Sequence, residues 1–155
     1  MSRQSPKAQL DRFLAKYTPA VAAFARTSIA AMDRRLPGAV RLVYDNYNAL
    51  VIGYGPTERP SEAVLSLAVM PRWVSLCFIQ SASTLPDPDK LLRGEGRMAR
   101  HIRLESPRDL EKPAVRALIA AALARSPKPI DPKGRGPLIV KSISAKQRPR
   151  RPAQE

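Results

Sequence analysis

The stretch between residues 40 and 79 most constrains the fold, because it holds short apolar runs separated by turn residues. The runs cover residues 40–44, 49–54, 63–70 and 73–79. The links between them contain Asp-Asn, Gly-Pro and Pro-Arg pairs, which favour turns. Strands joined by such short links pair antiparallel, so this stretch predicts a meander. Both alternating sides of the third run are largely apolar, so we expect helices on one face of the sheet and a further segment on the other.

Helix signals flank this meander on both sides. Ser5-Pro6 and Thr18-Pro19 each place an N-cap residue before a proline, and apolar residues then recur at helical spacing. Pro113 interrupts the last apolar run, which indicates either a kink or a second helix start. The predicted order is helices over 6–16 and 19–35, the meander, a short helix over 87–94, a strand over 100–105 and a helix ending near 125. The fold class is therefore α+β, with N- and C-terminal helices packed against an antiparallel sheet of about five strands, in the order ααββββαβα.

The predicted elements form one domain followed by a tail. A chain of 155 residues is long enough to bury a hydrophobic core, and residues 1–126 hold these elements. Residues 127–155 are rich in Pro, Gly, Lys and Arg, a composition that buries too little apolar surface to order itself. We therefore expect a mostly disordered tail, within which Leu138–Val140 and Ile143 are the exception and either add an edge strand or dock on the domain.

The strongest deviation in composition is the formal net charge of +14. Such a charge favours polyanions, because a protein that neutralises phosphates releases their counterions. Residues 128–155 carry eight Lys or Arg and two acids, so the excess is shared with the domain. The tail either contacts a phosphate backbone or only raises solubility. The candidate nucleic-acid contacts are Lys141, Lys146, Arg148, Arg150 and Arg151.

Other features of the sequence indicate a cytoplasmic protein. The chain has no apolar run of about 18 residues, and its N-terminus is polar, so we expect neither a membrane partner nor export. Cys77 is the only cysteine, which excludes an intrachain disulfide and a multi-cysteine zinc site. No cofactor is predicted.

The turn Arg93-Gly-Glu-Gly-Arg97 is the candidate ligand site. Its glycines would allow a ligand to approach the backbone, and arginines supply forked donors for phosphate or carboxylate. The alternative is that Gly94 ends a helix, Gly96 forms a turn and the arginines are solvated. The predicted site combines this turn with aromatic side chains that would contact the ligand on a concave sheet. Its residues are Arg93, Gly94, Gly96, Arg97, Arg100, Tyr47 and Trp73.

Nothing in the sequence forms a recognisable catalytic set. His101 is the only histidine, and no metal-binding or nucleophile motif surrounds it. Cys77 lies in the middle of a predicted strand, which favours a buried structural role. The acids are scattered, and the pair Asp87 and Asp89 is explained by capping. These observations favour a binding protein over an enzyme.

Several segments resemble the YdhG-like domain family. They are the helix ending MDRRLPG at residues 32–38, the stretches 48–54 and 64–78, and the block 85–105 with LLRGEG and RHIRLE. The resemblance covers about residues 8–125. It implies a bacterial protein with a curved antiparallel sheet packed against helices, and no established activity for most members.

One branch of that family is linked to frataxin-like iron delivery, which implies an iron chaperone as an alternative. Iron delivery normally draws on clustered carboxylates, because iron prefers hard oxygen and imidazole ligands. This chain is strongly basic and has one histidine, so no metal-ligand residue is carried over. The function predicted first is a non-enzymatic, cytosolic module that binds a small or anionic ligand. The alternatives are a nucleic-acid-associating protein and the iron chaperone, and the oligomeric state stays open.

Overall fold

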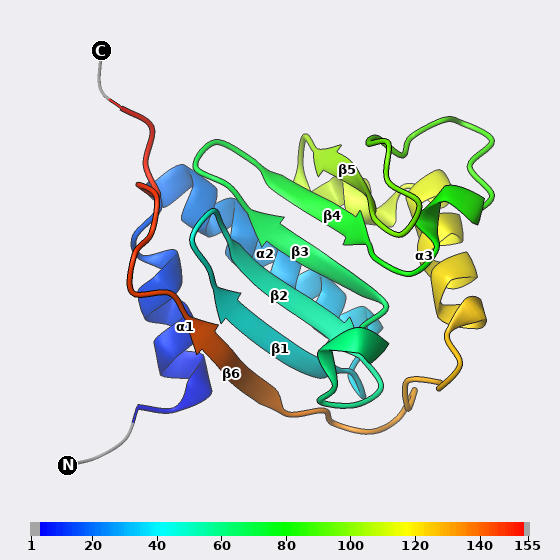
Figure 1. Cartoon of the computed structure of the whole chain (residues 1–155), viewed down its shortest axis with the longest axis horizontal. Helices are drawn as coiled ribbons and strands as arrows, with labels where there is room; N and C mark the ends of the chain where they lie inside the picture. Colours follow the sequence, from blue (N-terminus) through cyan, green and yellow to red (C-terminus); the bar gives the residue numbers. More distant parts are fainter. Residues whose placement is uncertain (1–3, 154–155) are drawn as a thin grey trace.

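The computed structural model describes residues 4–153, which form a six-stranded mixed sheet with helices packed on one face (Figure 1). The α-helices are α1 (Pro6–Leu14), α2 (Pro19–Arg35) and α3 (Pro113–Arg125). The strands are β1 (Val40–Asp45), β2 (Leu50–Gly55), β3 (Leu65–Val69), β4 (Val74–Phe78), β5 (Arg100–Leu104) and β6 (Leu138–Ile143). Their order across the sheet is β5-β4-β3-β2-β1-β6. The α+β class, the two N-terminal helices and the antiparallel meander are confirmed.

Local signals in the sequence set the helix starts. The Ser5 side chain accepts a hydrogen bond from the Ala8 N–H, and Thr18 does the same for Val21, so each cap satisfies a donor that the first turn leaves free. Pro113 begins α3, after a short 3₁₀ helix η3 (Pro107–Glu111). The second of the two alternatives for this proline, a new helix start, is therefore correct.

One face of the sheet carries the hydrophobic core. Val43, Ile52, Leu67, Leu76 and Ile102 are register partners across five strands, and all are at most 9% exposed. They belong to the same buried cluster as apolar residues of all three helices. Their neighbours along each strand point to the opposite face, because side chains alternate in a strand.

The short helix predicted over 87–94 is wrong. The Asp87 carboxylate accepts the backbone N–H of Leu91 at 2.8 Å and of Leu92 at 2.9 Å, which holds the chain in a turn. Arg93 then pairs with His101 on the outer side of β5, and Gly94 follows with a φ of +106°. The only helical turn described between β4 and β5 is the 3₁₀ helix η2 (Ala82–Thr84).

The sheet has six strands and is mixed, which corrects the prediction of about five antiparallel strands. β6 pairs with β1 in parallel, with a register shift between Val43 and Tyr44. Leu138 and Val140 pack against the core. The edge-strand alternative for this apolar segment is therefore correct, and the long return of the chain after α3 provides the crossover that a parallel pairing requires.

Two glycines let the return segment lie against the turn between α2 and β1. A Cβ at Gly136 would overlap the Ala39 carbonyl, and one at Gly38 would overlap the Asp131 carbonyl. We expect Gly136→Ala to lower the free energy of unfolding by about 1–3 kcal/mol, because backbone must shift to admit the methyl group. Urea denaturation checks this against Gly53→Ala, whose added Cβ finds only ordinary contacts of 3.8 Å or more. Equal stabilities of the two variants would contradict it.

The described part of the tail is anchored rather than free, which differs from the expectation of a mostly disordered segment. Arg150 is 5% exposed, and its guanidinium lies 3.0 Å from a carboxylate oxygen of the fully buried Asp45. Lys16 lies 2.6 Å from the other oxygen. Burial opposes the charge on Asp45, but hydrogen bonds from Lys16, Gln147 and Arg150 outweigh it and hold its pKa below the ordinary value. A buried carboxylate needs such partners, and the tail supplies Gln147 and Arg150.

No helix in residues 4–153 is both long enough and apolar enough to cross a membrane.

Candidate anion-binding pocket

The glycine- and arginine-rich turn forms an exposed loop beside β5. Arg93 is joined to His101 by two backbone hydrogen bonds of 2.8 and 3.0 Å, and Arg100 donates from Nε to the Gly96 carbonyl at 2.7 Å. Gly94 adopts positive φ as a turn residue and not as the end of a helix. Arg97 is exposed. The arginines of this loop therefore point to solvent or fasten the loop itself.

The two aromatic residues of the predicted site lie elsewhere. Tyr47 is in the β1–β2 turn, where the Arg148 guanidinium stands 5.6 Å from its ring centre. Trp73 is in the β3–β4 link, with the Arg103 guanidinium 4.2 Å from its ring centre. The structure thus divides the predicted residues among three places and does not bring them into one pocket.

The candidate nucleic-acid residues also separate. Lys141, Lys146 and Arg148 are exposed. Arg151 donates from Nε to the Lys16 carbonyl at 3.2 Å. Arg150 is buried against Asp45, so it is not available for a phosphate.

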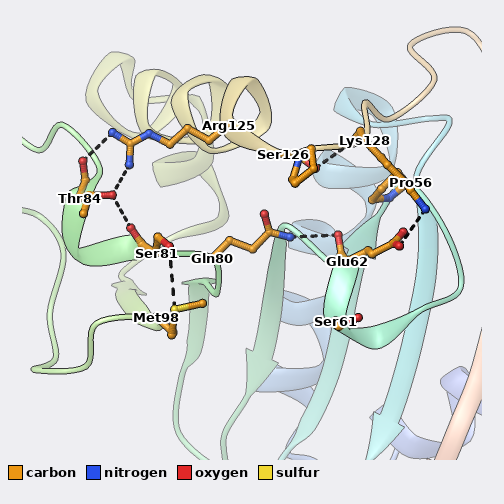
Figure 2. Close-up of a pocket in the computed structure, with 11 residues that line it drawn as sticks. Pro56, Ser61, Glu62, Gln80, Ser81, Thr84, Met98, Arg125, Ser126 and Lys128 are labelled. Atoms are coloured by element: carbon orange, nitrogen blue, oxygen red, sulfur yellow. Dashed lines mark hydrogen bonds and ion pairs between the residues drawn. The ribbon is translucent and has the colours of Figure 1, made fainter.

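A cavity of about 580 Å³ opens at the end of the sheet where α3 stops (Figure 2). Four segments meet there: the link from β2 to β3, the turn at η2, the loop before β5, and the C-terminal end of α3 with the residues after it. Its volume lies within the range of roughly 300–1,000 Å³ typical of small-molecule sites. The lining residues are Pro56, Ser61, Glu62, Gln80, Ser81, Thr84, Met98, Arg125, Ser126, Pro127 and Lys128.

The one carboxylate in this pocket is already neutralised. Glu62 accepts from the Thr57 hydroxyl at 2.6 Å and from Lys128 Nζ at 2.9 Å. These two hydrogen bonds lower the pKa of Glu62, the Thr57 bond most. Glu62 therefore stays ionised and paired, and it adds no free negative charge to the cavity.

The arginine in the pocket is held but not saturated. Arg125 donates to the Thr84 hydroxyl at 2.5 Å and to the Thr84 carbonyl at 2.6 Å (Figure 2). Thr84 in turn donates to the Ser81 carbonyl at 2.8 Å, which fixes the acceptor that orients the guanidinium. Since a guanidinium carries five N–H donors, three remain beyond these two bonds. The pocket thus presents a positioned cation with spare donors.

The sequence does not single out these residues. Arg125 is the basic residue in the last turn of α3, a common position that suits the helix dipole. Lys128 belonged to the predicted disordered tail, and the Ser and Thr lining residues are common in links. Of the lining residues, Met98 alone directly follows the predicted turn Arg93–Arg97.

Within residues 4–153, no group of three or more His, Cys, Asp or Glu side chains is arranged to hold a metal ion.

Comparison of the chain with protein-family models, with curated proteins and with solved structures finds no match. The YdhG-like resemblance therefore stays a prediction from the sequence.

Proposed function

We propose that this protein is a non-enzymatic, cytoplasmic binding module that takes a small organic anion in the pocket beside Arg125. The observation that carries the proposal is the guanidinium held by Thr84 with three spare N–H donors. The only carboxylate of the pocket is paired with Lys128, so one positive charge is left over. An anion with two oxygens, such as a carboxylate or a phosphate ester, would accept hydrogen bonds from two of the N–H donors that Thr84 leaves free.

The rest of the lining favours a ligand that also has an apolar part. Pro56, Pro127 and the thioether of Met98 supply apolar walls. Ser61 and Ser126 place hydroxyls among them. A phosphate or carboxylate joined to a ring or a short alkyl group fits this mixture, whereas a bare inorganic ion would leave the apolar surface wet.

The end of α3 works against an anion, and the arginine outweighs it. A helix C-terminus carries the equivalent of about half a negative charge. Arg125 brings a full positive charge at the same end, and Lys128 follows three residues later. The net electrostatic effect at the cavity is attraction of anions.

The positions of the possible nucleophile and base support binding rather than turnover. Cys77 and His101 do not line the pocket, and as register partners of each other they lie on the sheet. Burial raises the pKa of the Cys77 thiol, which keeps it protonated and weakly nucleophilic at neutral pH.

Thermal shift with phenyl phosphate, benzoate and inorganic phosphate tests the proposal. We expect phenyl phosphate or benzoate to raise the melting temperature of the full chain more than inorganic phosphate does, because a ligand that binds only the native state stabilises it. Arg125→Ala should weaken binding about 10- to 100-fold, since a charge-assisted hydrogen bond contributes about 1.5–3 kcal/mol.

Arg116→Ala is the matched control for that experiment. Arg116 lies on the same helix, is exposed, and pairs with Glu111 away from the cavity. It should bind like the wild type. The proposal is wrong if phenyl phosphate and benzoate stabilise the Arg125→Ala variant as much as they stabilise the wild type. It is also wrong if none of the three anions raises the melting temperature of the wild type.

A further inference from the structure

The second face of the sheet carries no α-helix in the described part of the chain, and only the 3₁₀ helix η1 (Pro60–Glu62) lies at one end of it, beside β2 (Figure 1). Tyr44, Val51, Ala68, Ser75 and Arg103 are register partners across β1 to β5 and alternate with core residues. Tyr44, Val51 and Ala68 are half-buried and lie outside the hydrophobic cluster that packs against the helices. Arg103 is exposed, and Ser75 is 5% exposed. The five residues form a continuous row across the sheet on this helix-free face.

A parallel row on the same face has small side chains at its centre. Gly53, Ser66 and Cys77 are register partners, and His101 continues the row on β5. Cys77 was expected in the core, but it is only half-buried and lies on this face. Gly53 and Ser66 are buried, and Ala63 lies beside Gly53, so the accessible part of this row is Cys77 and His101, toward β5.

The charge that the described strands place on this face is basic. They place no Asp or Glu on it, since Asp45 faces the helices, whereas the exposed Arg103 lies on it. At the β6 edge of the sheet, Lys141, Lys146 and Arg148 are exposed. Together with the net charge of +14, this arrangement is complementary to a polyanion.

Aromatic side chains stand on the same face. Trp73 precedes β4 and is covered on one side by the Arg103 guanidinium at 4.2 Å from its ring centre. Tyr44 lies on β1 and is half-buried. Three strand spacings separate β1 from β4, roughly 14 Å at 4.7–4.9 Å each, so a single base would not reach both rings. A strand crossing the sheet would stack different bases on them.

We propose that the helix-free face binds single-stranded nucleic acid. Unpaired bases would stack on Trp73 and Tyr44, and phosphates would meet Arg103 and the exposed cations beside β6. A duplex offers no free base faces, and a broad sheet face does not enter its grooves as a single helix or two-stranded ribbon does. This site is separate from the pocket at Arg125, so either proposal can fail without the other.

The single tryptophan gives a direct test. Trp73 is the only tryptophan of the chain, so base stacking should quench its fluorescence when 15-nucleotide oligouridine or oligothymidine is added to the full-length protein. Fluorescence polarisation of the labelled oligonucleotides, at 50 and 150 mM salt, measures the affinity. RNA that binds tighter than DNA would assign the natural ligand to RNA through its 2′-hydroxyl, and the reverse would assign it to DNA.

Variants distinguish stacking from general attraction. Trp73→Ala should weaken binding about 5- to 150-fold, as loss of one stacked base does, and Trp73→Phe should keep part of the affinity. Arg103→Ala should make the slope of log affinity against log salt concentration less steep by about 1, the value expected for the loss of one phosphate contact. Arg125→Ala, which removes the pocket cation, should bind like the wild type.

Three results would overturn the proposal. The first is no binding at 50 mM salt. The second is equal affinity for a 15-base-pair duplex together with unquenched tryptophan fluorescence. The third is wild-type affinity in the Trp73 and Arg103 variants while substitution of Lys141, Lys146 and Arg148 abolishes binding, which would show attraction to the tail alone.

Discussion

Replacing Asp45 with asparagine is expected to lower the free energy of unfolding by about 3–5 kcal/mol, because it removes the counter-charge of a buried arginine. Asp45 is fully buried and holds Lys16 at 2.6 Å and Arg150 at 3.0 Å. The arginine also donates to the carbonyls of Tyr47 and Asn46, so it cannot leave without releasing the tail. Urea denaturation monitored by circular dichroism measures the loss.

An exposed pair on the same protein provides the control. Glu111 is half-exposed and pairs with Arg35 and Arg116, so Glu111→Gln should change stability by no more than about 1 kcal/mol. If Asp45→Asn costs no more than Glu111→Gln, the buried network does not hold the tail.

The loss of stability caused by Asp45→Asn should become smaller in acid. The folded state lowers the pKa of Asp45, so its contribution is complete above the unfolded value of about 3.9 and is lost as the pH falls through the folded value. The stability difference between the wild type and Asp45→Asn should therefore be constant at neutral pH and shrink below about pH 4. A difference that grows in acid would contradict this assignment.

Removal of one hydroxyl from Tyr17 is expected to cost about 2–4 kcal/mol. This hydroxyl donates to the Val69 carbonyl at 2.7 Å and accepts the Leu50 N–H at 3.1 Å, at the end of the β2–β3 ladder. Tyr17 is 1% exposed, so phenylalanine would leave both backbone groups buried without a partner, at about 1–3 kcal/mol each. Burial raises the pKa of the Tyr17 phenol, so it stays a neutral donor.

Tyr47→Phe serves as the comparison for Tyr17→Phe. Tyr47 is 43% exposed, and loss of its hydroxyl should stay within about 0.5 kcal/mol. Guanidinium denaturation of both variants separates them. A Tyr17→Phe variant as stable as Tyr47→Phe would show that another group, such as water, takes over the two backbone partners.

The sequence predicts those elements whose signals are local. The N-caps at Ser5 and Thr18 and the turn residues between strands act over a few positions, and the helices and the meander follow them closely. The helix expected over 87–94 fails for a local reason of another kind. The Asp87 side chain takes the N–H groups of Leu91 and Leu92 and replaces the backbone acceptors that a helix needs.

Long-range placement is what the sequence does not reveal. Apolar residues at 138–143 indicate a strand, but only the fold shows that it lies beside β1 and runs parallel to it. The composition of the tail predicts disorder, and no local pattern in the sequence indicates that Arg150 pairs with Asp45. The pocket is hidden for the same reason, since Thr84 and Arg125 are 41 residues apart and neither has a distinctive neighbourhood.

The two proposed sites use different basic residues of the chain. The pocket uses Arg125 and Lys128 near the end of α3, whereas the helix-free face uses Arg103 and the cations beside β6. The arginine-rich loop at residues 93–100 lies beside both, and contributes Met98 to the first. Crossed variants, Arg125→Ala in the oligonucleotide experiment and Arg103→Ala in the small-anion experiment, therefore serve as each other's controls.

The parallel pairing of β6 with β1 has a consequence for synthesis of the chain. β1 covers residues 40–45 and its partner β6 covers residues 138–143, so the outer edge of β1 stays unpaired until residues 138–143 have left the ribosome. An unpaired strand edge is a template for association with other chains. Doubling the length of a loop adds only about 0.6 kcal/mol to the entropic cost of closing it. The long separation therefore delays the pairing of β6 with β1 but has little effect on the stability of the folded protein. A nascent chain that stops before residue 138 would present an open β-edge, and chaperones that recognise such edges would meet this protein between the emergence of β1 and that of β6.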